Sequence, residues 1–425
     1  MHTLKRFCSA PRRKAGRIPA ASKAAVGIAL FASILNCATA LPAGRFEDPP
    51  TAASEVLGAA AVGPNYKVLD PVTGDDLLRI YRVKSKYGTF TVQGDAMLLQ
   101  RRKELAAVNA LEKQSETKAF AEAFGQAAIG PLKFAANLVT DPANTVDRTV
   151  SGIGEMFDRV SSGLSNMDGS RDDFLKSALG VSSQRRQLAA ALGIDPYTDF
   201  TPLAHQLDQF GSATAAGGLV ISVGTVFIPG AAGLAVSTTS MMNGAGTLVR
   251  DKTSAQLLDI NRARLRKLGI ARGTIEKFLA NHYYTPGDQT VIASAFVLLK
   301  DAKDLGVYLA WLADVKRRDL AVHVRVRSEL LADYQLRTRA ITRFVNVEGI
   351  PLSELRDGST LFLAPFDLVA WTEAVGTTFA AITADLRNAG YRGDLILEIT
   401  GTATPMARQQ LKTLGWIIMN RQGFR

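Results

Sequence analysis

Apolar residues recur every three or four positions through most of the middle of this chain, and that spacing predicts a largely helical protein. The clearest example is a narrow seam of the kind found in helical bundles, formed by Val146, Val150, Ile153, Phe157, Val160 and Leu164. Helical spacing continues as far as a long helix expected at residues 316–343. We therefore interpret residues 96–345 as a helical domain.

A shorter region before these helices alternates apolar and polar residues, which is the pattern of half-buried strands. Strands are predicted at residues 66–69, 78–84 and 89–92. Their expected buried face consists of Tyr81, Val83, Phe90 and Val92. A ribbon of two or three strands is not stable alone, so this unit, residues 64–95, should pack on the helices.

The spacing of apolar residues changes again near the end of the chain. Short buried strands are predicted at residues 360–364, 395–400 and 416–419, with a helix at 367–389 and a shorter one that starts at Thr404-Pro405. This β-α-β-α-β order predicts a small α/β domain at residues 346–425. The chain as a whole should have an α+β fold that is predominantly α-helical, with an N-terminal β-ribbon, a central helical bundle and this C-terminal unit.

Ligands of such sheets bind beyond the carboxyl ends of the strands. In this chain those ends contain four polar residues, which we predict to bind a ligand: Asp367, Thr400, Thr402 and Thr404. Helix capping by Asp367 and Thr404 is the competing interpretation, because both residues stand where a helix is expected to begin.

The element order of this C-terminal unit is similar to that of OmpA-like peptidoglycan-binding domains. Such domains use an aspartate after a Gly-x-Thr strand end and an arginine on the following helix. Here Thr402 and Ala403 stand near the first position and Arg408 near the second, so the aspartate is missing. The resemblance implies a cell-wall polymer as a possible partner.

Residues 210–249 contain no charged side chain and are divided by Pro229-Gly230 into two arms. Each arm is close to the length that a helix needs to cross a bilayer. The second arm is rich in serine and threonine, which makes it a poor membrane span. A helical hairpin buried in the protein is the first interpretation, and conditional insertion into a membrane is the second.

The first forty residues differ from the rest of the chain in their charge. Residues 1–40 contain no carboxylate. Seven lysines and arginines lie within residues 5–23, an apolar run covers residues 24–35, and Ala38-Thr39-Ala40 follow. This order predicts a signal peptide, and hence a protein exported to the periplasm or cell envelope. An uncleaved anchor at residues 24–43, lipidation of Cys37 and an organelle transit peptide are the alternatives. Residues 41–63 then read as a flexible linker.

Removing the leader takes the formal net charge from +11 to +4 and removes both cysteines, Cys8 and Cys37. We therefore expect no nucleic-acid partner and no disulfide or thiolate metal site. The sequence contains no recognisable catalytic, metal or cofactor motif, so no cofactor is expected. A loop with Asp195, Asp199 and His205 could suit acid-base chemistry, although turn formation explains the same residues.

Three functions are compatible with these patterns. The first is an exported cell-envelope protein with a non-enzymatic binding or structural role, in contact with a cell-wall polymer or a membrane surface through its C-terminal unit. The second is a membrane-active protein that inserts the hairpin at 210–249. The third is a hydrolase of unidentified type.

Overall fold

The computed structural model describes residues 46–47, 51–75, 77–115, 181–215 and 240–421. Within these ranges the expected mixed α/β composition, rich in helix, is confirmed. No helix in the described ranges is both long and apolar enough to span a bilayer. The predicted leader, the seam at 146–164 and the middle of the hairpin, residues 216–239, lie outside the description.

An antiparallel sheet of four strands in the order β1-β2-β3-β4 forms the N-terminal part. With its neighbours it comprises α2 (Ala53–Leu57), η1 (Gly58–Ala61), β1 (Val62–Gly63), β2 (Tyr66–Asp75), β3 (Leu78–Ser85), β4 (Gly88–Gln93) and α3 (Asp95–Ser115). Tyr81, Val83, Phe90 and Val92 are all buried, and they share a core with apolar residues of α3. The sheet is larger than the predicted ribbon because β2 extends to Asp75 and β1 pairs with its start.

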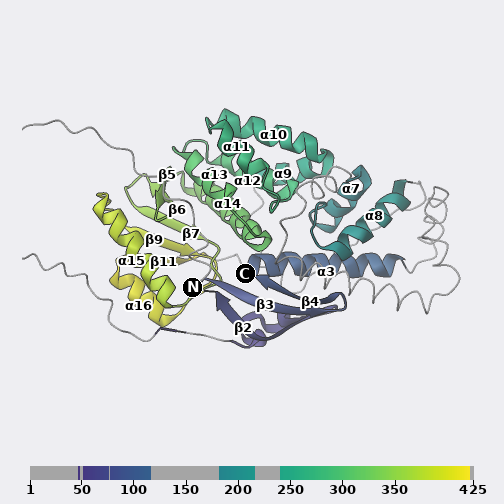
Figure 1. Ribbon diagram of the computed structural model, residues 1–425, viewed down its shortest axis with the longest axis horizontal. Coiled ribbons are helices and arrows are strands. Elements are labelled where there is room, and N and C mark those ends of the chain that lie inside the picture. The colour runs from purple at the N-terminus through teal and green to yellow at the C-terminus, as the bar shows by residue number, and fades with distance from the viewer. Residues whose placement is uncertain (1–45, 48–50, 76, 116–180, 216–239, 422–425) are drawn as a thin grey trace, which may run out of the picture.

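Helices make up the middle of the described chain (Figure 1). They are α7 (Ser183–Leu192), α8 (Thr201–Ala215), α9 (Ser240–Asp251), α10 (Ser254–Lys267), α11 (Arg272–Leu279), α12 (Pro286–Leu298), α13 (Leu305–Ala313) and α14 (Arg318–Thr338). Thr285 caps α12, since its hydroxyl accepts the N–H of Asp288 at 3.0 Å. Helix α12 contacts α9, α10 and α14, and its side chains are buried on nearly every side.

A five-stranded sheet in the order β11-β9-β7-β6-β5 forms the C-terminal part. Its elements are β5 (Ile341–Val347), β6 (Ile350–Leu355), β7 (Thr360–Ala364), β8 (Leu368–Val369), α15 (Glu373–Asn388), β9 (Leu395–Ile399), β10 (Thr402–Ala403), α16 (Pro405–Thr413) and β11 (Trp416–Asn420). Strands β7, β9 and β11 are parallel, whereas β5 and β6 pair in an antiparallel hairpin. The short strands β8 and β10 pair separately.

Both faces of this sheet are covered. Leu361 and Leu363 of β7 belong to the core shared with α13 and α14, whereas Phe362 packs with Phe379 of α15. This arrangement explains why all five residues of β7 are buried and why the strand reads as a continuous apolar run.

Two sequence predictions need correction here. The helix expected at residues 316–343 ends at Thr338, because Arg339 adopts a left-handed conformation (φ 51°) and β5 begins at Ile341. Arg343 therefore lies on a strand. The helix expected from Asp367 starts only at Glu373, after β8, with Thr372 as its cap.

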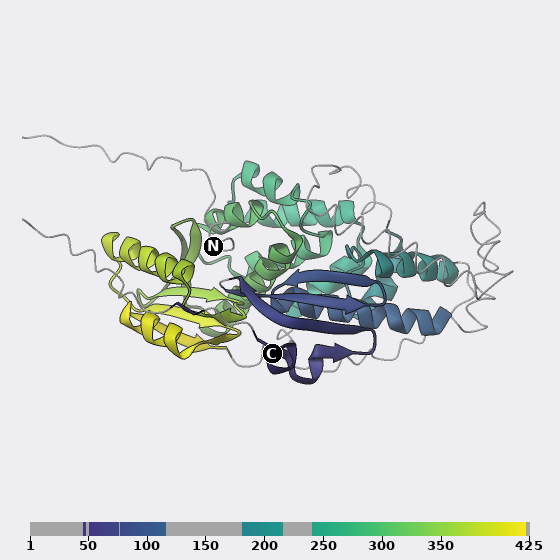
Figure 2. The same ribbon diagram turned by 60° about the horizontal axis from the view of Figure 1, so that its bottom comes forward.

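Helix α3 lies between the N-terminal sheet and the helices above it, and its N-terminal end points toward the C-terminal sheet (Figures 1 and 2). It contacts β3 and β4 on one side and α8 and α14 on the other. The start of α3 is therefore the place where all three parts of the described chain meet.

Candidate functional site

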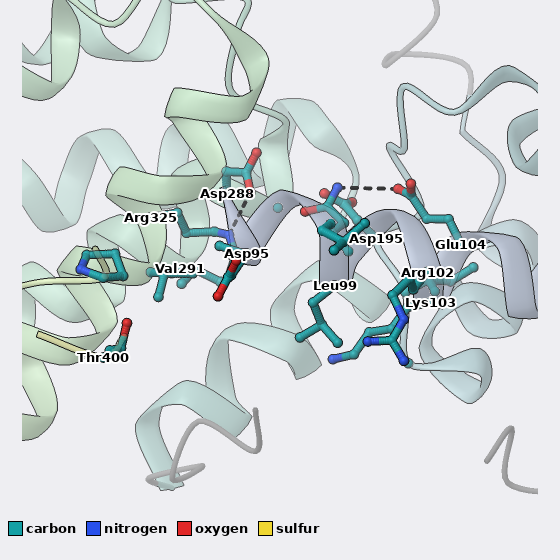
Figure 3. A pocket seen from close by; sticks show the side chains of 18 of the residues that line it. Asp95, Leu99, Arg102, Lys103, Glu104, Asp195, Asp288, Val291, Arg325 and Thr400 are labelled. Carbon is teal, nitrogen blue, oxygen red and sulfur yellow. Dashed lines mark hydrogen bonds and ion pairs between the residues drawn. The ribbon is translucent and has the colours of Figure 1, made fainter. Parts of the chain in front are cut away.

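A cavity of about 880 Å³ runs along the first three turns of α3 (Figure 3). Its wall combines the carboxyl ends of C-terminal strands with residues of α3, α12, α14, α2 and the loop after α7. The charged lining residues are Glu55, Arg79, Asp95, Arg102, Lys103, Glu104, Arg186, Asp195, Arg250, Asp288, Arg325 and Asp367. The other lining residues are mostly apolar and include Leu98, Leu99, Ile194, Val249, Val291 and Val326.

Three of the four residues predicted from the C-terminal sheet, Asp367, Thr400 and Thr402, line this cavity. The ends of β7 and β9 come together because the backbone at Gly401 passes against that of Asp367: a Cβ on Gly401 would lie 2.0 Å from the Asp367 carbonyl oxygen. Thr404 is not in the lining. Its hydroxyl accepts the N–H of Ala407 at 3.1 Å and donates to Glu47 at 2.6 Å, so it caps α16.

Asp367 is buried, and its carboxylate accepts backbone N–H groups from Arg79 at 2.8 Å and Asp95 at 3.0 Å. Burial, followed by the nearby Asp95 carboxylate, raises the pKa of Asp367, while the two N–H donors oppose that rise. Asp95 itself accepts a hydrogen bond from the Tyr81 hydroxyl and lies 3.4 Å from a guanidinium nitrogen of Arg79. At this end of the cavity, Asp367 therefore links the C-terminal sheet to the N-terminal sheet and α3.

Two further carboxylates meet in the middle of the cavity, where the loop after α7 touches the start of α12. The hydroxyl of Thr285 donates to Asp195 and accepts the N–H of Asp288. The other oxygen of Asp195 accepts the N–H of Tyr197 at 2.9 Å. There is room for this contact because residue 287 is a glycine, whose Cβ would stand 2.8 Å from an Asp195 oxygen.

The two carboxylates differ in their surroundings. Burial, and then the negative charge of Asp288, raise the pKa of Asp195. Burial acts on Asp288 in the same direction, but Arg318 and Arg325 outweigh it, so that the pKa of Asp288 lies below its usual range. Arg318 donates to one oxygen of Asp288, and Arg325 lies 3.0 Å from the other. An acid with a raised pKa thus stands beside one that stays ionised.

Lys103 and Glu104 occupy the far side of the cavity from Thr400 (Figure 3). Glu104 is buried and bonded to Arg101 at 2.7 Å and to the Thr198 hydroxyl at 2.6 Å. Lys103 is half-buried, and no hydrogen bond or ion pair joins its ammonium group to another described residue. Burial, followed by the like charge of Arg325, lowers the pKa of Lys103.

Sequence reasoning identified only part of this site. Asp195 was considered for acid-base chemistry, and it does line the cavity, whereas Asp199 pairs with Arg101 and His205 is exposed outside the lining. Lys103, Asp288 and Arg325 were missed. Lys103 and Arg325 lie on helices with an ordinary mixture of charges, and no local pattern separates them from a solvated surface. Asp288 stands at the start of α12, where its side chain belongs to a capping box.

The described residues contain no group of three or more histidine, cysteine or acidic side chains that could hold a metal ion. The candidate site is therefore a cavity lined by paired charges and apolar surface. No protein-family model, no curated protein and no solved structure matches this chain, so the resemblance to peptidoglycan-binding domains stays a prediction.

Proposed function

We propose that this chain is an exported, non-enzymatic protein of the cell envelope that binds a ligand in the cavity along α3. The observation that carries the proposal is the cavity itself, about 880 Å³, on which three of the four predicted residues converge. Small-molecule sites in proteins have volumes of about 300–1,000 Å³ and are lined by apolar groups with a few polar ones. The composition of this lining agrees with that description.

Blocking the cavity tests the proposal. Val291 lines it from α12, and Val291→Trp would fill part of the space with an indole ring. Val297 lies on the same helix outside the lining and is equally half-buried, so Val297→Trp is the matched control. In a thermal-shift screen of small molecules, hits should stabilise the wild type and Val297→Trp but not Val291→Trp. Equal stabilisation of all three proteins would contradict binding in the cavity.

Export rests on the basic and apolar order of residues 1–40. Fractionation of cells that express the full chain should place the protein outside the cytoplasm. A chain without residues 1–40 should stay in the cytoplasm. Cytoplasmic location of both forms would remove the export part of the proposal and leave the binding part standing.

Contact with a cell-wall polymer is the partner that the C-terminal resemblance suggests. Thr402 faces the cavity, whereas the exposed Arg408 bonds to the Ala403 carbonyl and to Asn420. Full-length protein should sediment with isolated peptidoglycan, and Arg408→Ala should weaken this binding. A protein that stays in the supernatant would exclude this polymer.

A hydrolase is the second candidate, favoured by the pair Asp195 and Asp288. Two neighbouring carboxylates with pKa values shifted in opposite directions are typical of sites that exchange protons with a substrate. In such an enzyme Asp195 would be the proton donor. Assays against esters and glycosides should then detect turnover that Asp195→Asn abolishes, and turnover that survives this change would exclude the role.

The membrane-active alternative stays a prediction, since residues 216–239 lie outside the description. Leakage from liposomes at neutral and mildly acidic pH would support it. A chain that neither releases a trapped dye nor resists extraction by carbonate would count against it.

A further inference from the structure

We infer that the cavity binds an elongated amphipathic carboxylate of the fatty-acid type, whose head group pairs with Lys103 and whose chain lies along the apolar lining. This inference rests on the proposed ligand-binding function and adds the chemical class of the ligand. Three features of the cavity support it. Lys103 has no hydrogen bond or ion pair to a described residue, Arg325 lies nearby, and apolar side chains line the space between Lys103 and Thr400.

Lys103 is the lining cation that makes no hydrogen bond or ion pair with another described residue, whereas Arg186 bonds to backbone carbonyls and Arg102 to the Tyr66 hydroxyl. Asp195 and Asp367 accept hydrogen bonds from a hydroxyl or from backbone N–H groups, and Asp95, Glu104 and Asp288 have arginine partners. Glu55 is exposed. Lys103 has no such bond, although it is half-buried. Because a charge removed from water is stabilised by an opposite charge, this position favours an anion.

The neighbours of Lys103 strengthen this preference. Arg325 is close enough to lower the pKa of Lys103, and its own guanidinium is held by Glu329 and Asp288. Glu329 opposes this repulsion only in part, and no hydrogen bond or ion pair joins its carboxylate to the ammonium group of Lys103. A bound carboxylate would relieve this repulsion and form a charge-assisted hydrogen bond.

Apolar surface continues away from Lys103. Leu99 lies one helical turn before it and projects to the same side of α3, and Val291 faces the cavity further toward Thr400 (Figure 3). Thr400 and Lys103 stand on opposite sides of the site, with Val291 and Leu99 between them (Figure 3). A flexible alkyl chain with one charged end matches this arrangement of apolar side chains with an unbonded lysine at one end.

The test measures the binding of decanoate and 1-decanol by titration calorimetry to the wild type and three variants. Lys103→Met keeps the length of the side chain and removes its charge. Lys113→Met is the matched control, because Lys113 is an exposed lysine near the end of the same helix, outside the lining. Val291→Trp again blocks the space. Butyrate reports on the head group without a long chain.

Wild type should bind decanoate more tightly than 1-decanol and butyrate. Lys103→Met should lower the affinity for decanoate by about tenfold, which is the effect of losing one charged hydrogen bond. The affinity for 1-decanol should stay unchanged. Lys113→Met should behave as wild type, and Val291→Trp should weaken both long-chain probes. Decanoate affinity that is equal in wild type and Lys103→Met would overturn the inference.

The same measurements distinguish a wrong ligand class from a wrong binding function. If decanoate fails to bind but other molecules in the screen bind in a way that Val291→Trp abolishes, the ligand class is wrong and the binding function stands. If no molecule of any class depends on Val291, both are wrong.

Discussion

The carboxylate of Asp367 accepts the backbone N–H of Asp95 at 3.0 Å, although the two residues are 272 positions apart in the chain. Asp95 is the first residue of α3, so Asp367 serves the start of that helix much as a local capping residue would. The same carboxylate accepts the N–H of Arg79 in β3. One side chain of the C-terminal unit therefore holds both the N-terminal sheet and α3 in place.

Asp367→Ala should destabilise the protein by about 1–3 kcal/mol for each N–H group left without an acceptor. Urea denaturation measures this change in the free energy of unfolding. Hydrogen exchange at the amides of Arg79 and Asp95 should accelerate together. Asp385→Ala, an exposed aspartate on α15, is the control and should have little effect. Unchanged protection of both amides would refute the linking role.

Arg421 anchors the end of the described chain. Its guanidinium donates to Glu398 at 2.6 Å and to Asp333 of α14, and all three side chains are largely buried. Arg421→Met should remove the bonded partner of Glu398 and leave Asp333 with Arg337, and it should lower the free energy of unfolding by about 3–5 kcal/mol. Arg408→Met, which removes an exposed arginine from α16, should cost far less. Equal losses in the two variants would contradict a special contribution from Arg421.

His323 makes stability sensitive to acid. It is buried against Phe366 in a stacked arrangement, and burial, with a further effect of Arg327, lowers the pKa of His323 to about 3. The unfolded chain therefore binds a proton near pH 6.5 that the folded chain does not bind, so stability falls as pH drops below that value. At pH 5 the loss is about 2 kcal/mol.

Replacing this histidine should flatten the pH dependence. Urea midpoints measured at pH 7 and pH 5 should differ less in His323→Phe than in the wild type, whatever the absolute stability of the variant. His205→Gln changes an exposed histidine on α8 and should retain the wild-type slope. A slope unaltered by His323→Phe would show that other groups cause the sensitivity.

Arg327 lies deep between α14 and the C-terminal sheet, and its hydrogen bonds to described residues go to backbone carbonyls. It donates to the carbonyls of Leu363 at 2.8 Å and Pro351 at 2.5 Å, and its guanidinium lies 5.1 Å from the ring centre of Trp311. Arg327→Lys keeps the charge but loses the planar group that makes both bonds and stacks on the ring. We expect it to destabilise the fold by about 2–4 kcal/mol. Near-UV circular dichroism should report a changed tryptophan environment, and an unaltered spectrum with full stability would disprove the prediction.

Local patterns predicted the start of one C-terminal helix. Thr404-Pro405 begins α16, and Thr285-Pro286 begins α12 in the same way, because a threonine hydroxyl and a proline at the next position act within one turn of the chain. The buried face of the N-terminal strands was predictable for a similar reason, since alternation is a property of the strand itself. Patterns failed where a turn decided the outcome, as at Arg339, whose left-handed conformation ends α14.

The sequence by itself determined the helix-rich α/β composition, several element boundaries and the nomination of Asp367, Thr400 and Thr402 near two strand ends. Only the tertiary structure decided what surrounds them. It brought Asp195 to Asp288 and placed Lys103 in a cavity without a hydrogen bond or ion pair to another described residue. The physical reason is that hydrogen-bond caps and amphipathic faces depend on neighbours within a few residues, whereas the burial and pairing of a charge depend on groups that packing brings from distant parts of the chain.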